Sequence, residues 1–109
     1  MNRYVTLLLL FSVCSGELFR PKDGQELNYV HVLFEWDQEP DALYYQLELV
    51  QLNSNETVIF DSIKTNLFVE RSSIAWDRIY QWRIRAIKQE NEYGDWIGPL
   101  IFNTIGSKL

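Results

Sequence analysis

Cysteine and histidine, which build most nucleophilic and zinc sites, are almost missing from this chain. Its 109 residues contain one of each, Cys14 and His31. A zinc site needs three or four His, Cys or carboxylate ligands. A histidine-activated nucleophile needs a Ser or Cys beside the imidazole. No glycine-rich phosphate loop is present either. The sequence therefore predicts no enzyme, no cofactor and no metal site.

Positive charge is also scarce. Ten Lys and Arg residues face 15 Asp and Glu residues, which gives a net charge of −5. An acidic surface repels phosphate backbones, so we expect no nucleic-acid partner.

Long apolar runs are limited to one, Val5 to Val13, which follows Arg3 and precedes the small residues Ser15 and Gly16. This pattern is typical of a secretory signal, and we assign residues 1–16 to a signal peptide and residues 17–109 to one domain. The run is too short for a membrane span, which needs about 20 residues. A buried N-terminal strand or helix is the alternative reading of the same run.

Cys14 leaves a further alternative open, a lipoprotein signal with an acylated cysteine. That anchor would change the expected localisation from secreted, or extracellular, to a lipid-anchored outer surface. If the signal is removed before Gly16 or Glu17, Cys14 leaves with it. The domain then has no disulfide in an oxidising compartment, and its core alone must hold the fold.

Alternation with a period of two runs through the rest of the chain and predicts half-buried strands. The clearest case is Tyr80–Ala86, where apolar residues alternate with Gln81, Arg83 and Arg85. Similar runs cover residues 30–36 and 43–49. Further strands are expected at 57–60 and 96–104, and another is expected to begin at residue 67. With an edge strand near Pro21, this makes about seven strands, with Gly98-Pro99 as a bulge or kink. The expected fold class is all-β, a sandwich of two antiparallel sheets.

Four motifs between Arg20 and Ile105 give the chain a resemblance to fibronectin type III domains. Phe34-Glu35-Trp36 resembles the Val-x-Trp of the second strand in that family. Residues 74–80 resemble its Leu-x-Pro-x-Thr-x-Tyr corner, with Trp76 in the place of proline. Residues 80–86 are similar to Tyr-x-Val-Arg-Val-x-Ala, and residues 94–99 to Gly-x-Trp-Ser-x-Pro. The resemblance implies an immunoglobulin-like sandwich.

Three large aromatic residues are the expected structural core, namely Trp36, Tyr80 and Trp82. Each tryptophan can bury roughly 150–250 Å² between the sheets. The Tyr80 hydroxyl is expected to satisfy a backbone group at the corner above Ile74. In cytokine-receptor modules of the resembled family, arginines interleave with tryptophans, so we expect Arg83 or Arg85 over the ring of Trp96.

Loops remain as the candidate sites for recognition. The candidate binding residues are Asp37, Glu39, Asp41, Lys88, Gln89, Glu90, Asn91, Glu92, Tyr93 and Asp95. We expect the acidic loop 37–41 and the polar loop 88–95 to cluster at one end of the sandwich. Carboxylates on a loop sometimes bind calcium, but a solvated turn without EF-hand spacing is the preferred reading. Asn55-Glu56-Thr57 is a glycosylation sequon, so Asn55 is a modification candidate.

The sequence thus predicts a non-catalytic extracellular module that binds protein or carbohydrate, or spaces neighbouring domains. The alternative is an accessory N-terminal domain of a longer secreted enzyme, such as a polysaccharide lyase or glycosidase. Glycosidase chemistry needs two carboxylates facing each other across a cleft, and a sandwich of this size is expected to have no obvious cleft.

Overall fold

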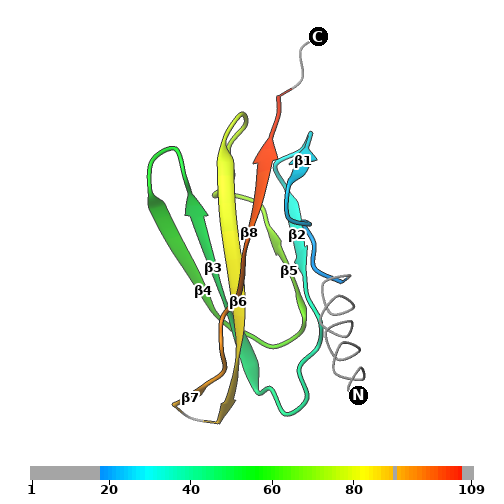
Figure 1. Ribbon diagram of the computed structural model, residues 1–109, viewed down its shortest axis with the longest axis vertical. Helices are drawn as coiled ribbons and strands as arrows, with labels where there is room; N and C mark the ends of the chain where they lie inside the picture. Colours follow the sequence, from blue (N-terminus) through cyan, green and yellow to red (C-terminus); the bar gives the residue numbers. More distant parts are fainter. Residues whose placement is uncertain (1–17, 90, 107–109) are drawn as a thin grey trace, which may run out of the picture.

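Eight strands form two sheets in the part of the chain that the computed structural model describes, residues 18–89 and 91–106 (Figure 1). The strands are β1 (Gln25–Leu27), β2 (Val32–Glu35), β3 (Tyr44–Gln51), β4 (Glu56–Ile63), β5 (Leu67–Glu70), β6 (Ile79–Gln89), β7 (Glu92–Tyr93) and β8 (Ile97–Thr104). These described residues contain no helix, and therefore none that could cross a membrane. The all-β architecture with two sheets agrees with the predicted β-sandwich.

The larger sheet has the strand order β1-β8-β6-β3-β4, and β7 pairs with the far end of β6. Its central pair is β3 with β6, antiparallel from Tyr44↔Ile87 to Gln51↔Tyr80. Strand β1 runs parallel to β8, and the other pairs are antiparallel. Strand β6 is therefore the central element, bordered by β3 on one edge and by β8 and β7 on the other.

The smaller sheet consists of β2 and β5, paired antiparallel from Val32↔Glu70 to Glu35↔Leu67. An isolated bridge joins Arg20 to Glu35, so the N-terminal part of the described chain runs beside β2. It then crosses to the larger sheet as β1. The edge strand predicted near Pro21 is therefore only partly present, as a single bridge at Arg20, and the first described strand begins at Gln25.

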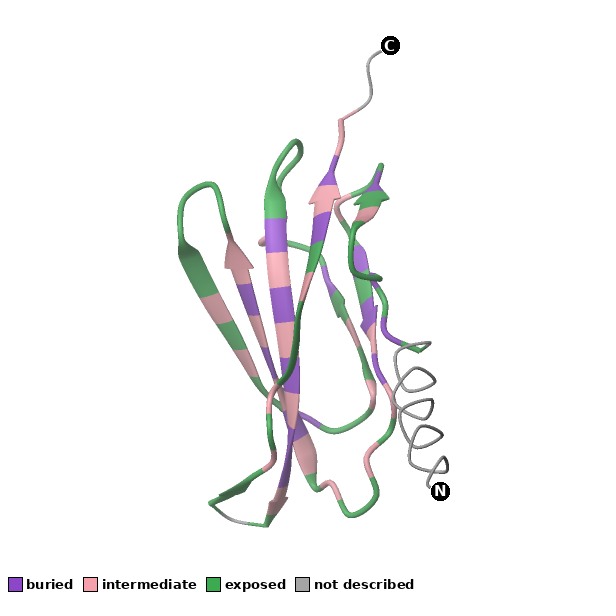
Figure 2. Cartoon of the chain, viewed as in Figure 1, coloured by how far each residue is buried: buried purple, intermediate pink, exposed green. Residues whose placement is uncertain are grey.

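The core fills the space between the sheets, because alternate residues of the facing strands point inward (Figure 2). Trp36, Tyr80 and Trp82 are all at most 1% exposed, which confirms them as core residues. The Trp82 ring makes an edge contact with Phe34 at a centroid distance of 5.1 Å. The Trp36 and Trp82 rings lie 6.4 Å apart.

The corner before β6 forms as predicted. Ile74 is buried, and the backbone N–H of Ala75 donates to the Tyr80 hydroxyl at 2.7 Å. A second donor, the Gln51 side-chain amide, lies 3.4 Å from the same oxygen. The hydroxyl of this buried tyrosine thus ties the loop before β6 to the strand itself.

Gly98 produces the predicted irregularity in β8. Its φ is +116°, and the pairing of β6 with β8 shifts register between Trp82 and Ile84. A Cβ at this position would lie 2.9 Å from the carbonyl oxygen of Trp82. Only glycine fits this close approach of the two backbones.

Two sequence predictions need correction. The run 43–49 predicts Leu43 on the inner face with Tyr45, but Leu43 is 55% exposed. It lies just before β3, and its backbone N–H bonds to the Ile87 carbonyl. The stretch predicted as a polar loop from Lys88 is partly strand: Lys88 and Gln89 finish β6, and Glu92–Tyr93 forms β7. Alternation does not show these features, because both depend on backbone pairing at the end of the sheet.

Candidate functional site

The two predicted recognition loops meet at one end of the sandwich, as expected. They enclose a groove of about 440 Å³, whose lining residues are Glu39, Ala86, Lys88, Gly94, Asp95 and Ile97. The Lys88 ammonium lies 3.6 Å from the Glu39 carboxylate across it. We call this end, with residues 37–41 and 88–95, the loop end; in Figure 1 it is the end at which β7 lies.

Hydrogen bonds donated by backbone N–H groups anchor both sides of the loop end. On one side, the N–H of Glu39 donates to the Tyr45 hydroxyl at 2.9 Å. On the other, the N–H of Gly94 donates to the Ala86 carbonyl at 2.7 Å. Tyr45 and Ala86 are themselves buried core residues. The charged side chains of the groove therefore stand on backbone that the core holds in place.

The other predicted loop residues that the structure describes are not among those lining the groove. Asp41 and Asn91 take positive φ values of 69° and 67°, which mark them as turn residues. Glu92 and Tyr93 are exposed on β7. Glu90 lies outside the described residues, as do the predicted signal peptide and Cys14.

A stack of planar groups crosses the outer face of the larger sheet beside the loop end. The Arg83 Cζ lies 4.2 Å from the Trp96 ring centroid, and the Arg85 Cζ lies 4.4 Å from it. Arg85 also lies 4.3 Å from the centroid of the Tyr93 ring. These contacts confirm the prediction that an arginine lies over Trp96, and they add Tyr93, which the sequence reading treated only as a loop residue. We call Arg83, Arg85, Trp96 and Tyr93 the outer stack.

The two arginines of the outer stack have different partners on β3. Arg83 donates to both carboxylate oxygens of Glu48, at 2.6 Å from Nε and 3.3 Å from Nη2. Arg85 donates from Nε to the amide oxygen of Gln46 at 2.7 Å. The Gln46 amide nitrogen in turn donates to Asp61 on β4 at 3.1 Å. One arginine is thus neutralised by a carboxylate, whereas the other meets a neutral amide.

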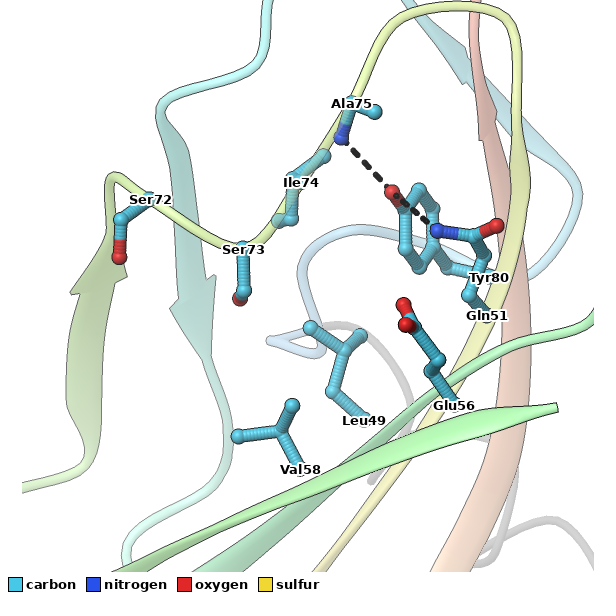
Figure 3. Close-up of a pocket in the computed structure, with 9 residues that line it drawn as sticks. All are labelled: Leu49, Gln51, Glu56, Val58, Ser72, Ser73, Ile74, Ala75 and Tyr80. Atoms are coloured by element: carbon cyan, nitrogen blue, oxygen red, sulfur yellow. Dashed lines mark hydrogen bonds between the residues drawn. The ribbon is translucent and has the colours of Figure 1, made fainter. Parts of the chain in front are cut away.

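A second groove, of about 310 Å³, lies near the other end of β6 (Figure 3). Its apolar lining is Leu49, Val58 and Ile74, and its polar lining includes Glu56 and the Tyr80 corner. The two grooves correct the expectation that the sandwich has no cleft. Asn55, the glycosylation candidate, lies in an exposed turn next to Glu56 with φ of 62°.

Glu70 is a buried carboxylate that sequence reasoning missed. It is 6% exposed, and its Oε2 accepts hydrogen bonds from the N–H and hydroxyl groups of both Ser72 and Ser73. Burial alone raises the pKa of Glu70, but the bonds from Ser73 and Ser72 outweigh it and hold the pKa below its usual value. The Glu-x-Ser-Ser spacing is the signal that would have found this turn.

Within residues 18–89 and 91–106, no group of three or more His, Cys, Asp or Glu side chains gathers to hold a metal ion. Of the acidic residues 37–41, Glu39 lines the groove. His31 is exposed. The loop end is therefore a charged groove whose backbone is hydrogen-bonded to core residues.

Comparisons of the chain with protein-family models, with curated proteins and with solved structures found no match.

Proposed function

We propose that this chain is an exported, non-catalytic recognition module with a fibronectin type III-like fold, and that it binds its partner through the loop end. The fold part of this proposal draws support from the strand order β4-β3-β6-β8 beside the pair β2 and β5. The tyrosine corner at Tyr80 and the four motifs of the sequence support it further.

One observation carries the functional part, namely the meeting of the two loops around one charged groove. Glu39 and Lys88 come from loops far apart in the sequence, yet both line it and pair across it. Loops placed on a rigid sheet are the usual carriers of binding in such sandwiches. Because Glu39, Lys88 and Asp95 are exposed or partly exposed, they can exchange their present contacts for contacts with a partner.

The size of the loop end predicts weak binding by the single module. A standard protein interface involves about 20–30 residues on each side, whereas six described residues line this groove. We expect affinities in the micromolar to millimolar range, about −8 to −4 kcal/mol, for a partner that contacts the loop end alone.

Peptide and glycan arrays probed with wild type and a Glu39→Ser/Lys88→Ser/Asp95→Ser variant test the proposal. We expect the triple substitution to abolish binding. Glu56→Gln, at the other groove, is the control because Glu56 is an exposed carboxylate outside the loop end, and it should bind as wild type does. Binding that survives the triple substitution would reject the loop end as the site, and turnover of a substrate would reject the non-catalytic class.

A further inference from the structure

Arg85 has a guanidinium group that is positioned on three sides before any ligand arrives. The rings of Trp96 and Tyr93 lie 4.4 Å and 4.3 Å from its Cζ. Its Nε is bonded to Gln46. A group fixed in this way loses little conformational entropy when it binds. The remaining donors, Nη1 and Nη2, make no hydrogen bond within the described chain, and the residue is partly exposed.

Arg83 shows what such a guanidinium group binds when the chain itself supplies the partner. It takes the Glu48 carboxylate through two N–H donors, and this bidentate geometry is the preferred match of arginine. Arg85 stands two residues further along the same face of β6, with the same tryptophan beside it. No carboxylate of the described residues pairs with it. Among the described residues, no carboxylate takes at Arg85 the position that Glu48 takes at Arg83.

We propose that Arg85 binds a carboxylate of a peptide partner, either an acidic side chain or a C-terminus. The inference deepens the proposed function and rests on it, because Tyr93 belongs both to the loop end and to the outer stack. The carboxylate accepts hydrogen bonds from Nη1 and Nη2, while the exposed ring of Tyr93 offers contact to the neighbouring part of the peptide.

The surroundings of Arg85 favour a single carboxylate over a polyanion. Asp61 lies one amide away through Gln46, and Glu48 lies beside Arg83. The chain carries a net charge of −5. A densely charged ligand would meet these carboxylates and be repelled, whereas one negative charge can be placed on Arg85 alone.

The outer stack also favours a peptide over an acidic sugar. Outward side chains two residues apart on a strand are separated by about 6.8 Å, which leaves room for one ring between them. Trp96 contacts Arg83 and Arg85 at 4.2 and 4.4 Å, so two guanidinium groups already pack against its ring. The indole face on which a sugar would stack is therefore occupied.

The first experiment follows the arginine Nε–H signals of the purified protein by ¹⁵N NMR during titration with sodium acetate, at an ionic strength held constant with sodium chloride. We expect the Arg85 signal to shift and saturate while the Arg83 signal does not move. In Glu48→Gln, both signals should respond, because Arg83 loses its internal carboxylate. Failure of acetate to move Arg85 would overturn the proposal, as would an equal response of Arg83 in wild type.

The Arg85→Lys variant separates the contribution of the two guanidinium donors from that of the positive charge. Lysine keeps the positive charge but lacks the planar pair of donors, so we expect at least about tenfold weaker acetate binding. The backbone amide NMR signals of Tyr93 and Trp96 report this binding. Unchanged binding in Arg85→Lys would overturn the bidentate site. An unchanged far-ultraviolet circular dichroism spectrum and unfolding midpoint would show that the variant is folded.

The second experiment compares three probes: an acetylated, amidated Gly-Ser-Glu-Ser-Gly peptide, the same peptide with Gln in place of Glu, and glucuronate. We expect the Glu peptide to bind more tightly than acetate, the Gln peptide not to shift Arg85, and glucuronate to bind no better than acetate. Tighter binding of glucuronate than of the Glu peptide would overturn the peptide assignment. The loop-end substitutions leave Arg85 in place, so the two failures are distinguishable. An Arg85 signal that acetate does not move would reject this inference alone, whereas array binding that survives the triple substitution beside an intact acetate response would reject the loop end alone.

Discussion

The two faces of strand β6 are held by different forces. On the inner face, Tyr80 and Trp82 are almost completely buried and pack against the rings of the other strands. On the outer face, Arg83 and Arg85 remain partly exposed and are held by stacked rings and hydrogen bonds to β3. Burial of apolar area dominates folding energy, whereas exposed cation–π contacts contribute only about 0.5–1 kcal/mol each. The inner face therefore determines stability, and the outer face and the loop end are the parts for which we propose recognition.

The largest expected difference in unfolding free energy is between variants that lack a tryptophan on the inner face and on the outer face. Trp82→Ala removes a ring that contacts Phe34 and Trp36 in the core and should lower the free energy of unfolding by about 3–5 kcal/mol. Trp96→Ala removes only two cation–π contacts and should cost about 1–2 kcal/mol. Urea unfolding of both variants measures the difference, and equal losses would contradict it.

The Tyr80 hydroxyl comes next in expected effect. Tyr80→Phe leaves the Ala75 N–H without its acceptor, so we expect a loss of about 1–3 kcal/mol. Gln51→Ala is the control, since its bond to the same hydroxyl is long at 3.4 Å, and it should cost under about 1 kcal/mol. If Gln51→Ala proved the more damaging substitution in urea unfolding, the role given to the corner would be wrong.

Glu70 is the buried carboxylate at the edge of an otherwise apolar inner surface, and it makes stability depend on pH. Its folded pKa is lowered, so its contribution is complete above the unfolded pKa of about 4.3. The contribution is lost as the pH falls through the lower, folded pKa. Glu70→Gln should therefore cost about 1–3 kcal/mol at pH 7, and the gap to wild type should close in acid. A gap that stays constant from pH 7 to about pH 2 would argue against an ionised Glu70.

The two core tryptophans offer a finer test within the inner face. Trp82 donates from Nε1 to the Pro21 carbonyl at 3.3 Å, whereas the buried Nε1 of Trp36 has no partner within the described chain. Trp36→Phe removes an unsatisfied donor, but Trp82→Phe removes a satisfied one. We expect Trp36→Phe to be the milder substitution by about 1 kcal/mol, measured by thermal or urea unfolding. The reverse order would mean that the Trp36 indole has a partner in solution.

Much of the inner face could be predicted from the sequence, because alternation directly reports which side chains point to a shared core. The core positions Trp36, Tyr80 and Trp82 belong to this class, whereas the bulge in β8 was predicted from the Gly98-Pro99 pair. The contact of an arginine, Arg83 or Arg85, with Trp96 was also predicted, from the family resemblance and the alternation together.

The remaining features depend on contacts between segments that alternation does not describe. Ile87 lies on the outward register of β6, yet it is fully buried beside its cross-strand partners Tyr44 and Tyr93. Glu70 is buried because a serine turn folds onto it. The groove at the loop end exists because two loops enclose it. The alternation of residues within one strand contains no information on how far apart two loops lie.

The most direct test of the division between stability and recognition is the unfolding free energy of the Glu39→Ser/Lys88→Ser/Asp95→Ser variant, measured in urea beside Trp82→Ala. The substitutions remove one ion pair at 3.6 Å whose side chains are 38% and 35% exposed, a type of contact worth about 0–1 kcal/mol. We predict that the triple variant unfolds within about 1 kcal/mol of wild type while it no longer binds the array ligands. A loss of stability as large as that of Trp82→Ala would contradict the account, because the loop end would then be part of what holds the fold.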